Sequence, residues 1–151
     1  MSCAPLREIW VDSEVAEVTF TREILARADL GVSVRTIELR KEEEKDLSAI
    51  PSKRDNHVLL LTRNRGNFIK ECQGSTEKYV CCGLETINAG WNCHLGCAYC
   101  LLSGYLEKRN VQVFVNLSDL FLELTSHLGR GGFHRLTTGE LTDSLFLDPL
   151  I

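Results

Sequence analysis

Residues 111–128, VQVFVNLSDLFLELTSHL, decide the fold class of this chain. Val111 to Val115 is the clearest strand pattern in the sequence, and it leads directly into apolar residues at helical spacing. Ser118 is the expected cap of an amphipathic helix that runs through His127 and stops at Gly129. A strand followed at once by such a helix is the building unit of an α/β protein. One face of the helix is expected to carry its apolar side chains, Leu120, Phe121, Leu124 and Leu128.

Further predicted strands flank this unit. Downstream, Phe133 to Thr137 predicts a strand, and Gly139 to Asp143 is its following loop. Upstream, His57 to Thr62 (HVLLLT) is a continuous apolar run that suits a strand buried on both faces, and Tyr79 to Asn88 is rich in β-forming residues. Because strands and helices alternate, we expect right-handed βαβ units and a parallel sheet, with functional groups at the carboxyl ends of its strands.

The amino-terminal part of the chain predicts a small α/β layer of its own. Strands are expected at Leu6 to Val11 and at Val32 to Leu39. Between them lies a predicted helix, Arg22 to Ala28, and the charged run Lys41 to Asp46 (KEEEKD) follows as a solvated segment. The expected helix signals are a cap at Thr19 or Thr21 and a stop at Gly31.

A basic stretch separates this layer from the rest of the chain. It extends from Arg63 to Lys78 and interleaves cationic side chains with glycine and phenylalanine. Two interpretations stay open: a surface that contacts nucleic-acid phosphates, or an ordinary linker. The cations concerned are Arg63, Arg65, Lys70 and Lys78.

The composition indicates one soluble globular protein that works in the cytoplasm. The chain has 151 residues, of which 44% are hydrophobic and 25% charged, and a net charge of -4 gives no global attraction to nucleic acid. No apolar run approaches the roughly 18 residues of a membrane-spanning helix. The first twelve residues include Arg7, Glu8 and Asp12, so they do not resemble a signal core.

The cysteines indicate metal or redox chemistry. There are seven, and six of them lie between Cys72 and Cys100, which fits a disulfide framework poorly. Cys93, Cys97 and Cys100 form a C-x3-C-x2-C loop. Three thiolates on one short loop suit an iron–sulfur cluster with one open iron. A zinc site that includes His94, or a redox pair of Cys97 and Cys100, remains an alternative.

The cysteine loop, with Tyr99 just before its third cysteine, resembles the signature of radical S-adenosylmethionine (SAM) enzymes. The longer stretch from His57 to Tyr105 resembles the spore photoproduct lyase family, in its order of apolar strand, basic linker, paired cysteines and cluster loop. A weaker resemblance continues over Leu141 to Leu150. The implied organisation is an amino-terminal α/β region with its linker over residues 1–78, followed over residues 79–151 by the first βα units of a partial (β/α) barrel that carries the cluster.

The resemblance also implies an activity and its cofactors. Cys93, Cys97 and Cys100 would ligate a [4Fe-4S] cluster, and the methionine part of SAM would bind the open iron. An external electron donor would reduce the cluster, and SAM would be cleaved to methionine and a 5′-deoxyadenosyl radical. Tyr99 would lie beside the adenine of SAM. The substrate implied by the family is a photoproduct in DNA, and the process is DNA repair.

The same resemblance assigns three residues near the carboxyl end to SAM. Gly139 and Glu140 are similar to the family's Gly-Gly-Glu element, whose carboxylate accepts hydrogen bonds from the methionine ammonium, and Thr142 offers a hydroxyl beside them. No catalytic residue is assigned.

Two departures from the family pattern fall on the repair steps. The lyases carry a hydrogen-donating cysteine at about the position of Glu140, whereas this chain has no cysteine after Cys100. They also tend to carry a tyrosine where Leu101 stands. Two alternatives to a repair enzyme therefore stay open: a zinc or iron–sulfur module that binds nucleic acid without catalysis, and an inactive remnant.

Other conspicuous residues are expected to be structural. Cys81 and Cys82 are adjacent on a predicted strand and are expected to be buried small hydrophobes. His127 and His134 are expected to cap or pack, and Asp119 and Glu123 are expected to form an exposed helix face. Cys3 and Cys72 are also expected to be structural.

The length of the chain bears on the barrel. A complete (β/α)8 barrel takes about 250 residues, so the region after residue 79 has room for only two or three of its strands before Ile151. We therefore expect a fragment or truncated product of a longer family member.

Overall fold

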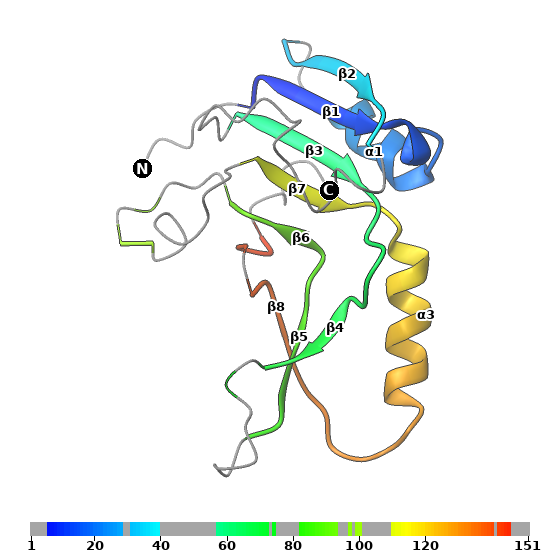
Figure 1. Ribbon diagram of the computed structural model, residues 1–151, viewed down its shortest axis with the longest axis vertical. Coiled ribbons are helices and arrows are strands. Elements are labelled where there is room, and N and C mark those ends of the chain that lie inside the picture. Colours follow the sequence, from blue (N-terminus) through cyan, green and yellow to red (C-terminus); the bar gives the residue numbers. More distant parts are fainter. Residues whose placement is uncertain are drawn as a thin grey trace.

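The computed structural model is an α/β structure with two sheets and a long helix that stands beside the smaller one (Figure 1). It describes residues 6–28, 31–39, 57–72, 74, 82–93, 97, 99–100, 110–140 and 142–145. The charged run 41–46 and most of the apolar stretch 98–106 lie outside the described residues.

The larger sheet has five strands in the order β2-β1-β3-β7-β6. Its parallel strands are β1 (Glu8–Asp12), β2 (Ser33–Ile37), β3 (Val58–Thr62) and β7 (Val111–Phe114), and the short β6 (Gly90–Trp91) joins antiparallel to β7. The predicted α/β class and parallel sheet are therefore confirmed. Because β7 pairs with β3, strands from both sides of the boundary predicted after residue 78 share this sheet.

The core forms around β3, whose five residues are all buried, as its unbroken apolar run predicts. Leu59 and Leu61 point to one face, where Ile24 of helix α1 (Thr19–Arg27) joins their cluster. Leu60 points to the opposite face and packs with Trp10 of β1. Each fully buried leucine contributes about 1.5–3 kcal/mol, so this strand is a main source of stability.

Helices α1 and α3 (Leu117–Leu128) begin earlier than their cap signals predict. In α1 the cap position is Val18, which makes no side-chain cap bond, and Thr21 lies fully buried inside the helix. The predicted caps at Thr19 and Thr21 are therefore wrong. Helix α3 (Leu117–Leu128) follows Asn116, so Ser118 lies within the helix and the cap predicted there is also wrong.

Tertiary contacts explain these differences. Thr21 faces the buried side of α1, and the Asn116 side chain is engaged by the neighbouring loop instead of the helix amides: its Oδ1 accepts from the Asn64 backbone N–H at 2.8 Å. The stop predicted for α3 is confirmed, because Gly129 is its C-cap and the Gly129 N–H donates to the Thr125 carbonyl at 3.0 Å. The stop predicted for α1 at Gly31 is wrong, because this helix ends at Arg27 with Ala28 as its C-cap.

The smaller sheet contains β4 (Ile69–Glu71), β5 (Leu84–Ile87) and β8 (Arg135–Thr138), in the order β4-β5-β8. The predicted strands in 79–88 and 133–137 are confirmed in shorter form, whereas β4 arises within the stretch expected to be a linker. β5 and β8 run parallel, with Ile87 opposite Thr138. Their carboxyl ends therefore lie together.

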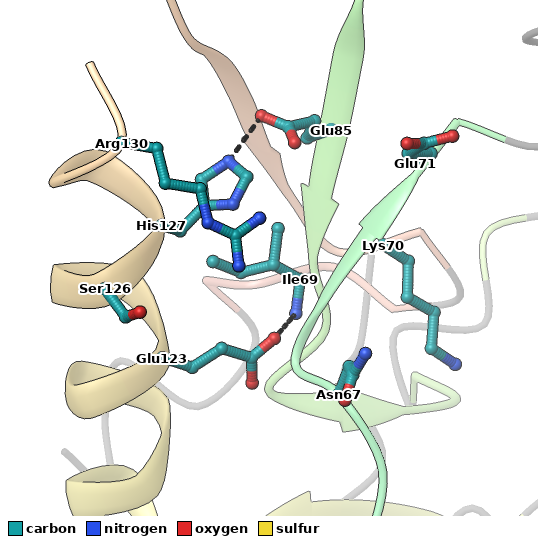
Figure 2. Close-up of a pocket in the computed structure, with 9 residues that line it drawn as sticks. All are labelled: Asn67, Ile69, Lys70, Glu71, Glu85, Glu123, Ser126, His127 and Arg130. Atoms are coloured by element: carbon teal, nitrogen blue, oxygen red, sulfur yellow. Dashed lines mark hydrogen bonds and ion pairs between the residues drawn. The ribbon is translucent and has the colours of Figure 1, made fainter.

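The apolar face predicted for α3 is not buried. None of the residues of this helix is buried, and Phe121 and Leu128 are 60% and 45% exposed. Helix α3 contacts the smaller sheet through polar side chains instead (Figure 2). No helix in the described part of the chain has the length and apolar character needed to cross a membrane.

Candidate cluster and cofactor site

The cysteine loop begins directly after β6, at a tightly constrained strand end. A Cβ on Gly90 would lie 2.5 Å from the carbonyl oxygen of Gln112, so only glycine lets β6 approach β7 this closely. Asn92 then adopts a left-handed conformation (φ 64), and its Oδ1 accepts a hydrogen bond from the Cys93 N–H at 2.8 Å. Cys93, the first predicted ligand, is half-buried and packs against the main core cluster.

The other two predicted ligands share one turn. The Cys100 N–H donates to the Cys97 carbonyl at 3.0 Å, and both cysteines are half-buried. Tyr99, between them, is 88% exposed. Its ring is therefore available to stack against a planar group.

The predicted Gly-Glu element follows β8. Gly139 has a φ of 76, its N–H donates to the Ile87 carbonyl at 3.1 Å, and a Cβ there would meet the Thr142 carbonyl oxygen at 2.3 Å. Glu140 is exposed but held twice by Asn88: its N–H donates to Oδ1 at 3.2 Å, and its Oε2 accepts from Nδ2 at 3.3 Å. The carboxylate therefore has a defined position at the carboxyl ends of β5 and β8.

Thr142 joins this loop to the cysteine loop. Its Oγ1 donates to the backbone carbonyl of Asn92 at 2.5 Å, and Asn92 directly precedes Cys93. The structure thus brings Thr142 to the residue that precedes the first cysteine of the predicted cluster, and Glu140 to Asn88 at the end of β5. Asn88 and Asn92, both buried, organise this contact, and sequence reasoning did not identify them. Their place at the ends of two short strands was the available signal.

A largely apolar pocket of about 220 Å³ lies at the same place. Gly139 and Thr142 line it, together with Ile87 of β5 and Val113 of β7. The pocket is smaller than the roughly 300–1,000 Å³ typical of ligand sites, so it has room for only part of a cofactor.

The basic stretch is engaged within the fold. Arg63 pairs with Asp119 of α3 at 2.6 Å, and Arg65 pairs with Glu14. The pKa of Asp119 lies below its ordinary value because the Asn116 side chain hydrogen-bonds the carboxylate and Arg63 adds its positive charge. Lys70 is exposed, whereas Lys78 lies outside the described residues. Two of the four cations proposed for a phosphate-contacting surface are therefore paired with carboxylates.

The acidic residues of α3 connect the helix to the segment before β4. Glu123 accepts hydrogen bonds from the backbone N–H groups of Phe68 (2.9 Å) and Ile69 (3.0 Å), the second of which is drawn in Figure 2. Asp119 holds Arg63 as described above. Both carboxylates are half-buried, so the prediction of a plain exposed face is wrong.

The cysteines outside the loop differ from the predicted burial. Cys82 is exposed, because it precedes β5 and is followed by Gly83, which is in the left-handed conformation (φ 67). The prediction of a buried Cys82 is therefore wrong, and Cys81 and Cys3 lie outside the described residues. Cys72 is half-buried, and its N–H donates to the Leu84 carbonyl at 3.0 Å.

A second group of chemically active side chains lies at the far end of the smaller sheet. His127 Nε2 lies 2.9 Å from Glu85 Oε2, and His134 Nδ1 lies 3.6 Å from the same oxygen. Hydrogen bonding to His127 lowers the pKa of the Glu85 carboxyl below its ordinary value, against the opposing effect of burial. These residues are separated by up to 49 positions (134 minus 85) and form no sequence motif, so nothing in the sequence linked them.

No protein-family model and no curated protein sequence matches the chain. Solved structures of spore photoproduct lyase do match. The enzyme complexed with dinucleoside spore photoproduct has a TM-score of 0.72 at 19% identity, over 99% of this chain and 44% of that one. A double mutant with bound AdoMet and dinucleoside spore photoproduct gives the same values. A cysteine-to-serine mutant gives 0.71 at 18% identity, over 99% and 44%.

The chain thus spans less than half the length of the solved structures it matches. The alignment extends through the amino-terminal layer and the site-bearing strands alike, since it covers 99% of this chain. The resemblance predicted from the sequence is confirmed at the level of the fold: this chain has the fold of spore photoproduct lyase over 44% of that enzyme's length.

Proposed function

We propose that this chain is a radical SAM protein of the spore photoproduct lyase type. In this proposal Cys93, Cys97 and Cys100 hold a [4Fe-4S] cluster, and the loop that contains Glu140 and Thr142 binds SAM. The observation that carries the proposal is the 2.5 Å hydrogen bond from Thr142 to Asn92, which connects the loop of the SAM residues to the residue before the first cluster cysteine.

The donor set fits a cluster. All three cysteines are half-buried and lie on one short loop, and thiolates are the ligands that iron–sulfur clusters require. When bound and reduced, such a cluster supplies the electron for the reductive cleavage of SAM.

The residues after β8 fit the methionine part of SAM. Glu140 presents a carboxylate fixed by Asn88, which suits an ammonium group. Gly139 leaves no room for a side chain, because the Thr142 carbonyl oxygen lies where a Cβ would be, so glycine lets this loop fold tightly beside Glu140. Tyr99 has a freely exposed ring on the cysteine turn, in keeping with a contact to the adenine.

The substrate we propose is a photoproduct in DNA. The support is the fold shared with an enzyme that has been solved with a dinucleoside spore photoproduct. Glu140 stands at about the position where the lyases carry their hydrogen-donating cysteine, and the chain has no cysteine after Cys100. SAM cleavage and lesion repair are therefore separate parts of the proposal, and each needs its own experiment.

The first experiment is anaerobic reconstitution with iron and sulfide. We expect a brown protein whose electron paramagnetic resonance signal, after reduction, changes when SAM is added, together with formation of 5′-deoxyadenosine. Alanine at Cys93, Cys97 or Cys100 is expected to abolish the cluster. Cys82→Ala is the matched control, because this free thiol is exposed and lies outside the loop. A colourless protein that takes up only zinc would contradict the proposal.

The second experiment tests the substrate. The wild-type chain and the Glu140→Cys variant are incubated with SAM, a reductant and a dinucleotide photoproduct. Repair by the variant is the expected result, because the substitution places a hydrogen-donating thiol at this strand end. SAM binding is expected to be weaker than in the wild type, because the carboxylate proposed for the methionine ammonium is lost. If neither protein repairs the lesion while both cleave SAM, the radical SAM assignment stands and the photoproduct is not the substrate.

A further inference from the structure

Glu85, His127 and His134 converge from three different elements of the fold. Glu85 lies on β5, His127 near the end of α3, and His134 just before β8. Each offers one ligand atom, and these atoms all lie within 4.8 Å of one another. The two imidazole rings are 4.8 Å apart between centroids and inclined at 59°. They therefore lie side by side, both beside the same carboxylate.

Hydrogen bonds among the three residues do not satisfy all of their polar atoms. His127 Nε2 is hydrogen-bonded to Glu85 Oε2 at 2.9 Å, whereas His134 Nδ1 lies 3.6 Å from that oxygen. The second ring nitrogen of His134, Nε2, is buried and has no hydrogen-bond partner in the described part of the chain. A buried imidazole nitrogen without a partner is costly. A metal ion beside this carboxylate would bind Nδ1, which faces Glu85 Oε2 at a distance beyond a hydrogen bond of ordinary length, and Nε2 would keep its unmet hydrogen bond.

The ligand set and its spacing suit a divalent transition metal. Two imidazoles and one carboxylate are the protein ligands of many zinc sites that keep a fourth position open. Bonds of about 2.0–2.1 Å place adjacent ligand atoms of a tetrahedral site about 3.3 Å apart. The two distances to Glu85 Oε2, 2.9 Å and 3.6 Å, lie on either side of that value, and the ligand atoms of the two histidines lie within 4.8 Å of each other. The three side chains would therefore have to draw closer together to bind one ion.

The surroundings leave access to the cluster. Glu85 and His127 line one end of a pocket of about 600 Å³ between α3 and the smaller sheet (Figure 2). The charged lining comprises three carboxylates and two cations: Glu71, Glu85, Glu123, Lys70 and Arg130. The net charge of the lining, with neutral histidines, is therefore -1, which favours entry of a cation. The three ligand side chains are only 17–19% exposed, so an ion there is partly desolvated and held more firmly.

We propose that Glu85, His127 and His134 form a mononuclear site for a divalent transition-metal ion such as Zn²⁺, with a water molecule in the fourth position. The site uses no cysteine and is independent of the proposed cluster. Metal there would link the end of α3 to β5 and β8. Because the ligands come from three elements, binding is expected to stabilise this half of the fold.

The test uses Co²⁺ as a spectroscopic probe on the full chain, followed by displacement with Zn²⁺. We expect one equivalent of Co²⁺ to give visible d–d bands that persist, without thiolate charge-transfer bands, when Cys93, Cys97 and Cys100 are all replaced by serine. His127→Gln retains a hydrogen-bonding group toward Glu85 but is a poor metal ligand. It is expected to weaken Co²⁺ binding by about tenfold or more, and His134→Ala to do the same.

Glu71→Gln is the control, because Glu71 is an exposed carboxylate in the same pocket but outside the cluster. It is expected to bind Co²⁺ as the wild type does. Circular dichroism identifies any variant that has lost its fold, and Glu85→Gln then provides a further ligand change. The proposal is overturned if folded His127→Gln binds Co²⁺ as tightly as the wild type, or if every Co²⁺ band disappears with the three cysteines.

Discussion

Replacing Gly139 by alanine tests whether the loop after β8 is built as the site requires. The residue has a φ of 76, and an added Cβ would lie 2.3 Å from the Thr142 carbonyl oxygen. This contact adjoins the hydrogen bond from Thr142 to Asn92. The substitution therefore strains the link between the proposed SAM loop and the cysteine loop.

The structure allows the two costs to be separated. A left-handed backbone costs a non-glycine residue about 1–2 kcal/mol. At Gly131 this is the only cost, because its φ is 73 and nothing lies within 4 Å of an added Cβ. At Gly139 the carbonyl of Thr142 must also move, and the loss of one hydrogen bond adds about 1 kcal/mol. We expect the free energy of unfolding to fall by about 2–3 kcal/mol in Gly139→Ala.

The assay is urea denaturation of both alanine variants, followed by circular dichroism, with SAM binding measured on the reconstituted proteins. Gly139→Ala is expected to be less stable than Gly131→Ala and to bind SAM more weakly, whereas Gly131→Ala should bind SAM normally. Equal losses of stability in the two variants, with equal SAM binding, would refute the reasoning about this loop.

Three further predictions follow from the described contacts. Thr142→Val keeps the shape of the side chain but removes its hydrogen bond to Asn92, so denaturation should show a loss of about 1 kcal/mol. The lowered pKa of Glu85 stabilises the fold fully above its ordinary value of 4.5, and this contribution is lost as the pH falls through the lowered pKa. Unfolding curves between pH 7 and pH 3 should show a larger loss of stability in the wild type than in Glu85→Gln, which keeps only the contribution of other carboxylates such as Asp119. Asn116→Ala removes a buried side-chain amide that hydrogen-bonds the Asn64 backbone and Asp119, and the free energy of unfolding from urea denaturation is expected to fall by about 2–3 kcal/mol. In Asp119→Asn it should fall by less than about 1 kcal/mol, because the ion pair of Asp119 with Arg63 is half-exposed.

Periodicity predicted the elements that form the main core. The run His57 to Thr62 became the central buried strand β3, and Val111 to Val115 became its neighbour β7. Such patterns are reliable because a strand covered on both faces needs apolar residues at every position. The order of the predicted elements likewise placed the cysteine loop after a strand end, and in the structure Cys93 follows directly after β6 and Asn92.

Local signals were less reliable where tertiary contacts competed with them. Thr21 has the chemistry of a helix cap but is buried within α1, and Ser118 lies inside α3. The apolar face of α3 was correctly identified as a pattern, yet Phe121 remains 60% exposed. Spacing shows that apolar residues share one face, but it does not say which surface covers that face.

The sequence by itself determined the α/β class, the succession of the main strands along the chain and the resemblance carried by Cys93, Cys97 and Cys100, because these features depend on neighbouring residues. Only the tertiary structure decided that β7 joins the amino-terminal sheet and that Thr142 reaches the Asn92 carbonyl. Only the tertiary structure brought Glu85, His127 and His134 together. The physical reason is the same in each case: strand pairing and side-chain contacts join residues that lie far apart along the chain, and no local pattern of apolar and polar residues records which distant partners will meet.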